Sequence, residues 1–328
     1  MALCSKLAPR FDVVILLFAL SLVVPLAAAA ATGPGPAPIE KRDGYVDTGG
    51  AVIYYVTIGT GPPLMILHGG PGSTHDYFLP YLLPLAKDRQ LVLIDERGSG
   101  RSQTLTDHTE YNLEAMAEDV EAVRVALALG KMDLLGHSFG GLLAQAVAVN
   151  HPAGIRRLIL ASTGSSAVRV NADFKQVKDS LDPELRARLE ALEARGIIGD
   201  DGAQLPEYRR LADQALAPYS YFIRPPAWDG KGQPLGWDVL NQMWSAKSDF
   251  RIDGNLAGFD FTEALQKLKI PALVIYGDHD MVTDATARET HSALEGSVLV
   301  EIPRSAHMTF VDQNQAFIEA VSRFLTSE

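Results

Sequence analysis

Short apolar runs recur along the chain, and each is followed by a glycine, a proline or a polar residue. The runs are four to eight residues long, too short for most helices, and several are rich in β-branched and aromatic residues. This length and composition predict strands. The predicted strands span residues 51–58, 64–67, 91–94, 132–135, 158–161, 272–276 and 298–302.

Amphipathic segments separate most of these runs. Residues 112–129, for example, carry apolar side chains at helical spacing and carboxylates on the opposite face, which predicts a helix. Apolar strands that alternate with helices form parallel sheets covered on both sides. The predicted fold class is therefore α/β, with a mostly parallel central sheet and helices on both faces. The other predicted helices span residues 142–150, 181–195, 207–216, 285–294 and 314–325.

The alternation stops between residues 165 and 258, where charged helices are predicted and no strand is. A helical segment inserted between two strands of a sheet packs over that sheet. We therefore expect residues 165–258 to form a helical cap, with an irregular segment at 225–234. The sheet and its covering helices then comprise residues 41–164 and 259–328.

The first 31 residues have the composition of a signal peptide. Two basic residues precede an apolar stretch at residues 13–24, and alanines at 27–31 provide small-residue cleavage sites. Residues 1–31 therefore predict a secreted or periplasmic protein. The alternative is an uncleaved membrane anchor, because the apolar stretch approaches the length of a membrane span. Residues 32–40 are rich in proline and glycine and predict a linker.

The composition limits the classes of molecule that we expect this protein to bind. The net charge of −11 disfavours nucleic acid, because phosphate binding needs a basic face. Cys4 is the only cysteine, and cleavage of the predicted signal would remove it, excluding disulfides and thiolate chemistry. No His, Asp and Glu cluster has metal-ligand spacing, so we expect neither metal nor cofactor. The expected partner is a small substrate. Membrane contact is expected only through an uncleaved N-terminal segment, and the oligomeric state stays open.

The motif GHSFG at residues 136–140 lies between a predicted strand and a predicted helix. This is the context of the nucleophile elbow of α/β-hydrolases, where a serine occupies a strained turn and only glycine fits beside it. The turn exposes the serine hydroxyl and directs the N-terminus of the next helix at developing negative charge. Ser138 is therefore the predicted nucleophile of an α/β-hydrolase fold.

A serine hydroxyl needs a base and a carboxylate to orient that base, and in this fold both follow the serine, carboxylate first. Asp280 and His307 each follow a predicted strand, and sites in open α/β sheets lie at the carboxyl ends of strands. They are the predicted carboxylate and base. Asp278 is the alternative carboxylate, and His279 and His291 are the alternative bases.

The motif HGGPG at residues 68–72 follows another predicted strand. Acyl transfer passes through an oxyanion that needs preorganised N–H donors. We expect one donor from Phe139, after the nucleophile, and the other from Gly70. His68 is expected to brace this turn. The segment DERGSGRS at residues 95–102 lacks the ending of a nucleotide-binding loop and predicts a buried Asp–Arg turn that holds the site loops.

Together these motifs resemble the proline iminopeptidases and related serine aminopeptidases. The resemblance rests on HGGPG at 68–72, DERGSGRS at 95–102 and the order of Ser138, Asp280 and His307, and it covers nearly everything after residue 45. It implies release of an N-terminal residue, often proline, from short peptides without a cofactor.

The resemblance also implies cap carboxylates that hold the free ammonium of the substrate. Asp249 looks like the family's acid in the cap, and Glu207 is a second candidate. A buried ammonium must be paired, which two acids would achieve. One departure concerns His137, because the family usually has glycine before the nucleophile, whereas histidine there is found in many esterases and lipases.

The sequence therefore predicts a serine hydrolase that acts through an acyl-enzyme, with a peptide bearing a free N-terminus as the leading substrate. A carboxylesterase or lactonase with the same triad is the alternative. A non-catalytic ligand-binding relative is a further alternative, because fold does not determine function. Ser138 excludes haloalkane dehalogenases and epoxide hydrolases of this fold, since both use an aspartate nucleophile.

Overall fold

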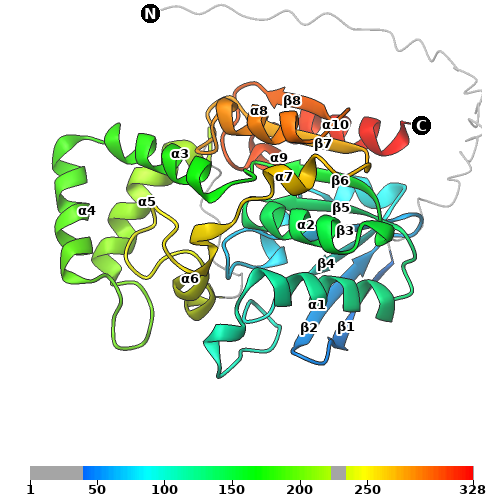
Figure 1. Ribbon diagram of the computed structural model, residues 1–328, viewed down its shortest axis with the longest axis horizontal. Helices are drawn as coiled ribbons and strands as arrows, with labels where there is room; N and C mark the ends of the chain where they lie inside the picture. The colour runs from blue at the N-terminus through cyan, green and yellow to red at the C-terminus, as the bar shows by residue number, and fades with distance from the viewer. Residues whose placement is uncertain (1–39, 223–233, 328) are drawn as a thin grey trace, which may run out of the picture. The chain divides into compact units, whose positions relative to one another are not determined.

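The computed structural model describes residues 40–222 and 234–327, and these residues build an eight-stranded sheet in the order β1-β2-β4-β3-β5-β6-β7-β8 (Figure 1). The β1–β2 and β2–β4 pairs are antiparallel and every other pair is parallel, which confirms the predicted mostly parallel sheet. The strands are β1 Lys41–Asp47, β2 Val52–Ile58, β3 Pro63–Leu67, β4 Gln90–Ile94, β5 Met132–His137, β6 Ile155–Ala161, β7 Ala272–Gly277 and β8 Val298–Ile302.

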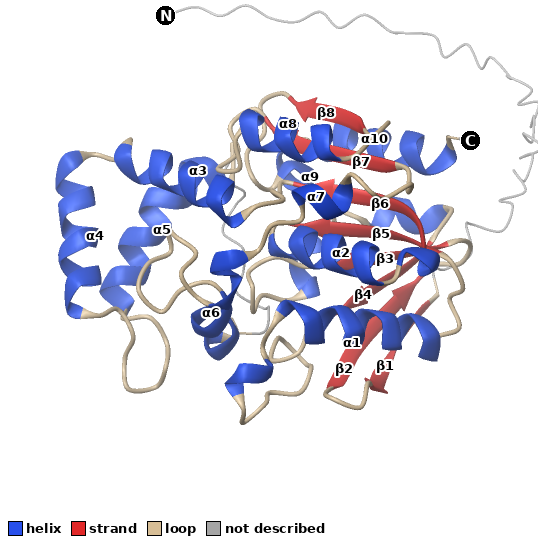
Figure 2. Ribbon diagram, in the orientation of Figure 1, coloured by secondary structure: helices blue, strands red, loops and turns tan. Residues whose placement is uncertain are grey.

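Helices cover both faces of the sheet (Figure 2). Successive residues of β3 enter opposite clusters: Met65 belongs to the cluster that includes α1 (Leu113–Ala126) and α2 (Phe139–Asn150), and Ile66 belongs to the cluster that includes α10 (Asn314–Thr326). A strand buried on both sides is apolar throughout, which explains the continuous runs. These helices are α1 Leu113–Ala126, α2 Phe139–Asn150, α7 Thr262–Leu265, α8 Asp284–Ala293, α9 Thr309–Asp312 and α10 Asn314–Thr326, with 3₁₀ turns at η1 His75–Phe78, η2 Leu83–Lys87, η3 His108–Glu110 and η4 Pro152–Gly154.

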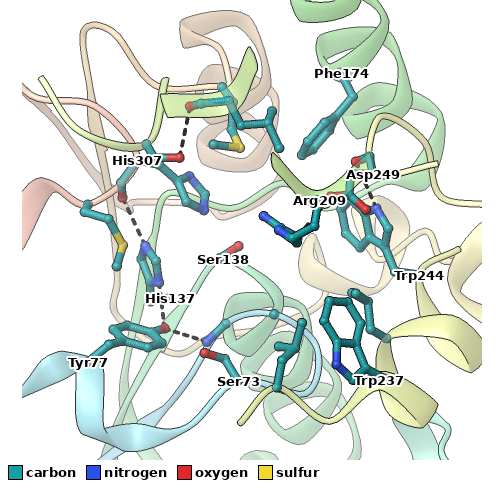
Figure 3. Close-up of a pocket in the computed structure, with 18 residues that line it drawn as sticks. Ser73, Tyr77, His137, Ser138, Phe174, Arg209, Trp237, Trp244, Asp249 and His307 are labelled. Carbon is teal, nitrogen blue, oxygen red and sulfur yellow. Dashed lines mark hydrogen bonds and ion pairs between the residues drawn. The ribbon is translucent and has the colours of Figure 1, made fainter. Parts of the chain in front are cut away.

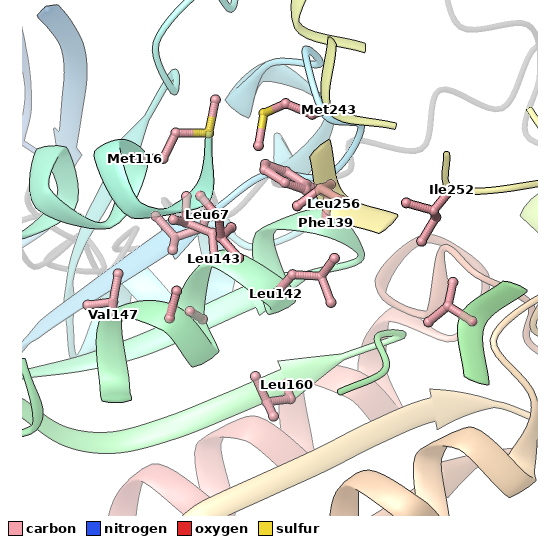
Figure 4. Close-up of a cluster of buried hydrophobic side chains, with 14 of the residues drawn as sticks. Leu67, Met116, Phe139, Leu142, Leu143, Val147, Leu160, Met243, Ile252 and Leu256 are labelled. Carbon is pink, nitrogen blue, oxygen red and sulfur yellow. The ribbon is translucent and has the colours of Figure 1, made fainter. Parts of the chain in front are cut away.

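Between β6 and β7 the chain leaves the sheet and forms further helices at one end of it, on the left in Figure 1. Met243 and Leu256 of this insertion belong to the same buried cluster as Phe139 and Leu143 of α2 (Figure 4). The insertion therefore shares a core with the sheet layer, although its limits at residues 165 and 258 stay a prediction. Its helices are α3 Ala167–Asp179, α4 Pro183–Arg195, α5 Pro206–Ser220, α6 Trp237–Met243 and η5 Asn255–Gly258.

Apart from the 3₁₀ turns, five elements of the described residues were absent from the sequence prediction: β1, α3, α6, α7 and α9. β1 is largely exposed and reads KRDGYVD, without the apolar alternation of a half-buried strand, and it forms by pairing along the edge of β2. α3 did carry a signal, since Val170, Phe174 and Val177 are buried at helical spacing behind the N-cap Ser166. Most of the predicted irregular segment at 225–234 lies outside the described residues.

The localisation predicted from residues 1–31 requires correction. Those residues, and all but the last of the linker predicted at 32–40, lie outside the described part of the chain. Among residues 40–222 and 234–327, no helix is both long enough and apolar enough to cross a membrane. The prediction of a secreted or periplasmic protein, with its membrane-anchored alternative, therefore has no support in the structure and is withdrawn.

Candidate active site

Ser138 occupies a sharp turn between β5 and α2. Its backbone has φ 56° and ψ −123°, a conformation that costs a non-glycine residue about 1–3 kcal/mol. The flanking glycines allow the turn to close: a Cβ on Gly136 would lie 2.1 Å from the carbonyl oxygen of Gly140. A Cβ on Gly140 would in turn lie 2.3 Å from the carbonyl oxygen of Leu67. This geometry is that of a nucleophile elbow.

Replacing Gly140 with alanine is expected to destabilise the protein by about 3 kcal/mol, because the added methyl group meets the rigid backbone of β3. Urea denaturation measures the loss. Gly258→Ala is the matched control, since a Cβ there has nothing within 4 Å, and its change should stay within about 0.5 kcal/mol. Equal stability of the two variants would contradict the close packing of the elbow.

His307 and Asp280 form a hydrogen-bonded pair beside the elbow. His307 Nδ1 lies 2.7 Å from Asp280 Oδ1, and the Asp280 side chain is fully buried, whereas that of His307 is 12% exposed. The backbone N–H of Val282 donates to the same Oδ1 at 2.9 Å, which holds the carboxylate in place. The Nδ1 contact leaves His307 Nε2 as the nitrogen available to a nucleophile.

The alternative residues are engaged elsewhere. Asp278 lies 2.7 Å from Nδ1 of its neighbour His279, and that histidine is 53% exposed. His291 lies in α8 and bonds to the hydroxyl of Ser297. Of the predicted residues, the structure brings Asp280 and His307 together and leaves Asp278, His279 and His291 apart from them.

Ser138 and His307 face one cavity of about 530 Å³, a size that suits a small ligand (Figure 3). Gly70, the predicted oxyanion donor, lines the same space, and Phe139 is the first residue of α2, where the N–H groups lack helical partners. The rest of the wall is mainly apolar and comes largely from the insertion. These apolar residues are Phe174, Leu216, Leu235, Trp237, Leu240, Trp244, Met281 and Met308.

Asp249 reaches the cavity, but it is paired. Its Oδ2 lies 3.2 Å from Nη1 of Arg209, and Gln204 donates to its Oδ1. Burial raises the pKa of Asp249, and the Arg209 guanidinium opposes that shift. Arg209, which the sequence analysis did not single out, also binds Asp213 through Nε and Nη2. Its side chain extends toward Ser138 in Figure 3.

The structure does not bring Glu207 to the cavity. Its side chain is 58% exposed and lies 3.4 Å from Arg188 at the surface of the insertion. Glu207 is in the first turn of α5, two residues before Arg209 and therefore about 200° around the helix axis from it, so the two side chains leave the helix on nearly opposite sides. The predicted contact between Glu207 and the substrate is therefore dropped.

The predicted supporting turns are buried behind the site. His68 lies 2.6 Å from Glu96, and neither side chain is exposed by more than 1%. Burial raises the pKa of Glu96 to about 6. Asp95, in the DERGSGRS segment, accepts from the backbone N–H of Arg101 at 3.0 Å and from that of His75 at 2.9 Å. These contacts tie the loops after β3 and β4 together.

Comparison with known proteins agrees with this geometry. Residues 62–313 match the α/β-hydrolase fold family. A proline iminopeptidase of Heyndrickxia coagulans is 31% identical over 293 residues, which cover 87% of this chain and 99% of that protein. The chain belongs to the proline iminopeptidase family of α/β-hydrolases. It is therefore an enzyme of the hydrolase class.

Other members of the family extend the match. The proline iminopeptidase of Lactobacillus acidophilus is 31% identical over 80% of this chain and 89% of its own length. The crystal structure of the Mycobacterium smegmatis proline iminopeptidase aligns with a TM-score of 0.73 over 87% of this chain and 97% of that one, at 23% identity. At that identity the second likeness is one of fold.

Proposed function

We propose that this chain is a serine aminopeptidase of the proline iminopeptidase type, which releases an N-terminal residue from short peptides. The observation that carries the proposal is the Asp280–His307 pair, which opens onto the same cavity as the Ser138 elbow. Family membership supports the class of reaction. Three separate segments of the chain have to converge for this arrangement, and simple ligand binding requires none of them.

The reaction proceeds through an acyl-enzyme. His307 Nε2 takes the proton of the Ser138 hydroxyl as its oxygen attacks the scissile carbonyl carbon. Asp280 holds Nδ1–H and stabilises the imidazolium, and the N–H groups of Gly70 and Phe139 bind the oxyanion. The imidazolium then gives its proton to the leaving amine as the C–N bond breaks. In the second half of the reaction His307 takes a proton from water as the water oxygen attacks the acyl carbon, and it gives that proton to the Ser138 oxygen as the ester bond breaks.

Asp249 is the proposed anchor for the ammonium of the substrate. Arg209, Asp213 and Asp249 form one ionic cluster, in which one guanidinium faces two carboxylates. With all three groups ionised, the cluster carries one negative charge in excess. A substrate ammonium at Asp249 would neutralise that charge, as a buried cation requires.

The test compares kcat/KM on a prolyl aryl amide, an alanyl aryl amide and a short-chain aryl ester for wild type and Asp249→Asn. We expect Asp249→Asn to lose about a hundredfold on the amides, or about 3 kcal/mol of transition-state binding, and little on the ester. Glu207→Gln is the matched control, because that acid is exposed on the same insertion, and it should change all three rates by less than about twofold.

An esterase or lactonase is the second candidate, and the Arg209–Asp249 contact favours it. If Arg209 keeps Asp249 neutralised when substrate is present, the cavity offers mainly apolar and aromatic walls, which suit an uncharged acyl group. Turnover of the ester alone, with Asp249→Asn indistinguishable from wild type, would support this candidate over the aminopeptidase. A non-catalytic protein would fail to react with an organophosphonate at Ser138.

A further inference from the structure

Gly69 is held by side chains at both of its backbone polar atoms. Its N–H donates to the hydroxyl of Tyr77 at 2.5 Å, and its carbonyl oxygen lies 2.8 Å from Nδ1 of His68. A carbonyl oxygen only accepts, so His68 Nδ1 carries a proton. His68 is itself held by Glu96, 2.6 Å from its Nε2. Hydrogen bonds at its N–H and at its carbonyl oxygen therefore fix the backbone of Gly69, which lines the cavity.

This restraint acts on Gly70 through peptide geometry. The Gly69–Gly70 peptide bond is trans, and in a trans peptide the carbonyl oxygen and the following N–H point in opposite directions. Holding the Gly69 carbonyl toward His68 therefore directs the Gly70 N–H to the other side. A Cβ on Gly69 would lie 3.0 Å from the Cβ of Ser138, so the loop backbone at Gly69 lies directly beside the nucleophile.

The Tyr77 hydroxyl continues the chain of hydrogen bonds toward the base. It lies 2.8 Å from Nδ1 of His137, and His137 Nε2 lies 3.0 Å from the backbone carbonyl of His307 (Figure 3). That carbonyl accepts only, so His137 carries its proton on Nε2 and accepts the Tyr77 proton at Nδ1. Each hydrogen bond from Gly69 through Tyr77 and His137 to His307 then has one donor and one acceptor, and no two groups compete for the same role.

Burial keeps this arrangement in one protonation state. Burial, with a smaller effect from His307, lowers the pKa of His137 well below its ordinary value, so its imidazole stays neutral. Burial also raises the pKa of Tyr77 well above its ordinary range, so its hydroxyl keeps its proton. The Tyr77 ring stacks on Phe310 at 6.0 Å between centroids, and His137 meets the same ring edge-on at 5.2 Å.

We propose that Tyr77 and His137 are positioning residues. Their hydrogen bonds connect the Gly69 peptide to the backbone of His307 and so fix the position of the oxyanion donor, the Gly70 N–H, relative to the base. The inference rests on the proposed function, because Gly70 matters only if an acyl oxyanion forms. It also gives a role to the histidine that stands where the family usually has glycine. Without these hydrogen bonds the Gly70 N–H can turn away from the oxyanion. The enzyme then binds the transition state less tightly, with a smaller effect on binding of the substrate in the ground state.

The test is the steady-state kinetics of Tyr77→Phe, which removes the hydroxyl and keeps the ring on Phe310. We expect kcat on the best of the three substrates to fall between about tenfold and about a hundredfold, less than complete loss of an oxyanion donor, with KM changed by less than about threefold. The rate of organophosphonate inactivation should fall in parallel, because the phosphonyl oxygen occupies the oxyanion position. Tyr81→Phe is the matched control, since Tyr81 packs on the same Phe310 ring, and it should match wild type.

A pair of variants at His137 keeps the test decisive if Tyr77→Phe folds poorly. His137→Gln retains one acceptor and one donor, and we expect it to recover most of the activity that His137→Leu loses. Tyr77→Phe with His137→Leu should be no slower than the worse single variant, because both break one chain. Wild-type kcat in Tyr77→Phe and His137→Leu would overturn the inference, and so would a rise in KM alone. Failure of the wild type to react with the phosphonate would instead overturn the proposed function.

Discussion

Replacing Ser138 with alanine is expected to lower kcat by about six orders of magnitude on any substrate that the wild type hydrolyses, because the acyl-enzyme can no longer form. The substitution removes one oxygen atom from the elbow and leaves the packing of Gly136 and Gly140 intact. The free energy of unfolding should therefore change by less than about 1 kcal/mol. Active-site titration with an organophosphonate, followed by mass measurement, should show one adduct on the wild type and none on the variant.

Ser73→Ala is the matched control, because Ser73 lines the same cavity. It should react with the phosphonate as the wild type does and keep kcat within about threefold. Residual activity of Ser138→Ala within tenfold of the wild type would mean that another group attacks the substrate. In that case the proposed acyl-enzyme on Ser138 is incorrect, whatever substrate is preferred.

Replacing Asp280 with asparagine is expected to lower kcat by about four orders of magnitude. The amide of an asparagine can donate to Nδ1 of His307, which stabilises the tautomer with its proton on Nε2. That nitrogen then has no lone pair to accept the proton of Ser138. The pH dependence of kcat/KM measures this effect: the variant should stay slow at neutral pH and regain activity only where hydroxide takes the serine proton.

Asp278→Asn separates the two carboxylates that follow β7. Asp278 lies two residues away and pairs with exposed His279, so we expect its replacement to lower kcat by less than about tenfold. The opposite order, with Asp278→Asn the slower enzyme, would show that the orienting carboxylate had been assigned to the wrong residue. Equal effects would mean that the loop conformation, rather than the Asp280–His307 contact, is what both variants disturb.

For Asp249, the proposed substrate-binding acid, the sequence predicted the residue but not its neighbours. Asp249 was predicted from its resemblance to a family segment, and it does reach the cavity. Its pairing with Arg209 was not predicted, because the two residues lie 40 positions apart, Arg209 on α5 and Asp249 in the loop after α6. Arg209 looked like one more charge on an amphipathic helix. Only the packing of α5 against the loop that carries Asp249 turns that charge inward.

The sequence by itself determined the strands of the sheet other than β1, the elbow and the order of the candidate triad. Those features are local: a strand buried on both faces must be apolar throughout, and the turn at Ser138 needs glycines beside it. Tertiary structure decided what depends on distant contacts. The Tyr77–His137 and His137–His307 hydrogen bonds join residues 60 and 170 positions apart, and no periodicity records such pairs. The same holds for exposed Glu207, since the face of a helix that meets the cavity is set by packing against its neighbours.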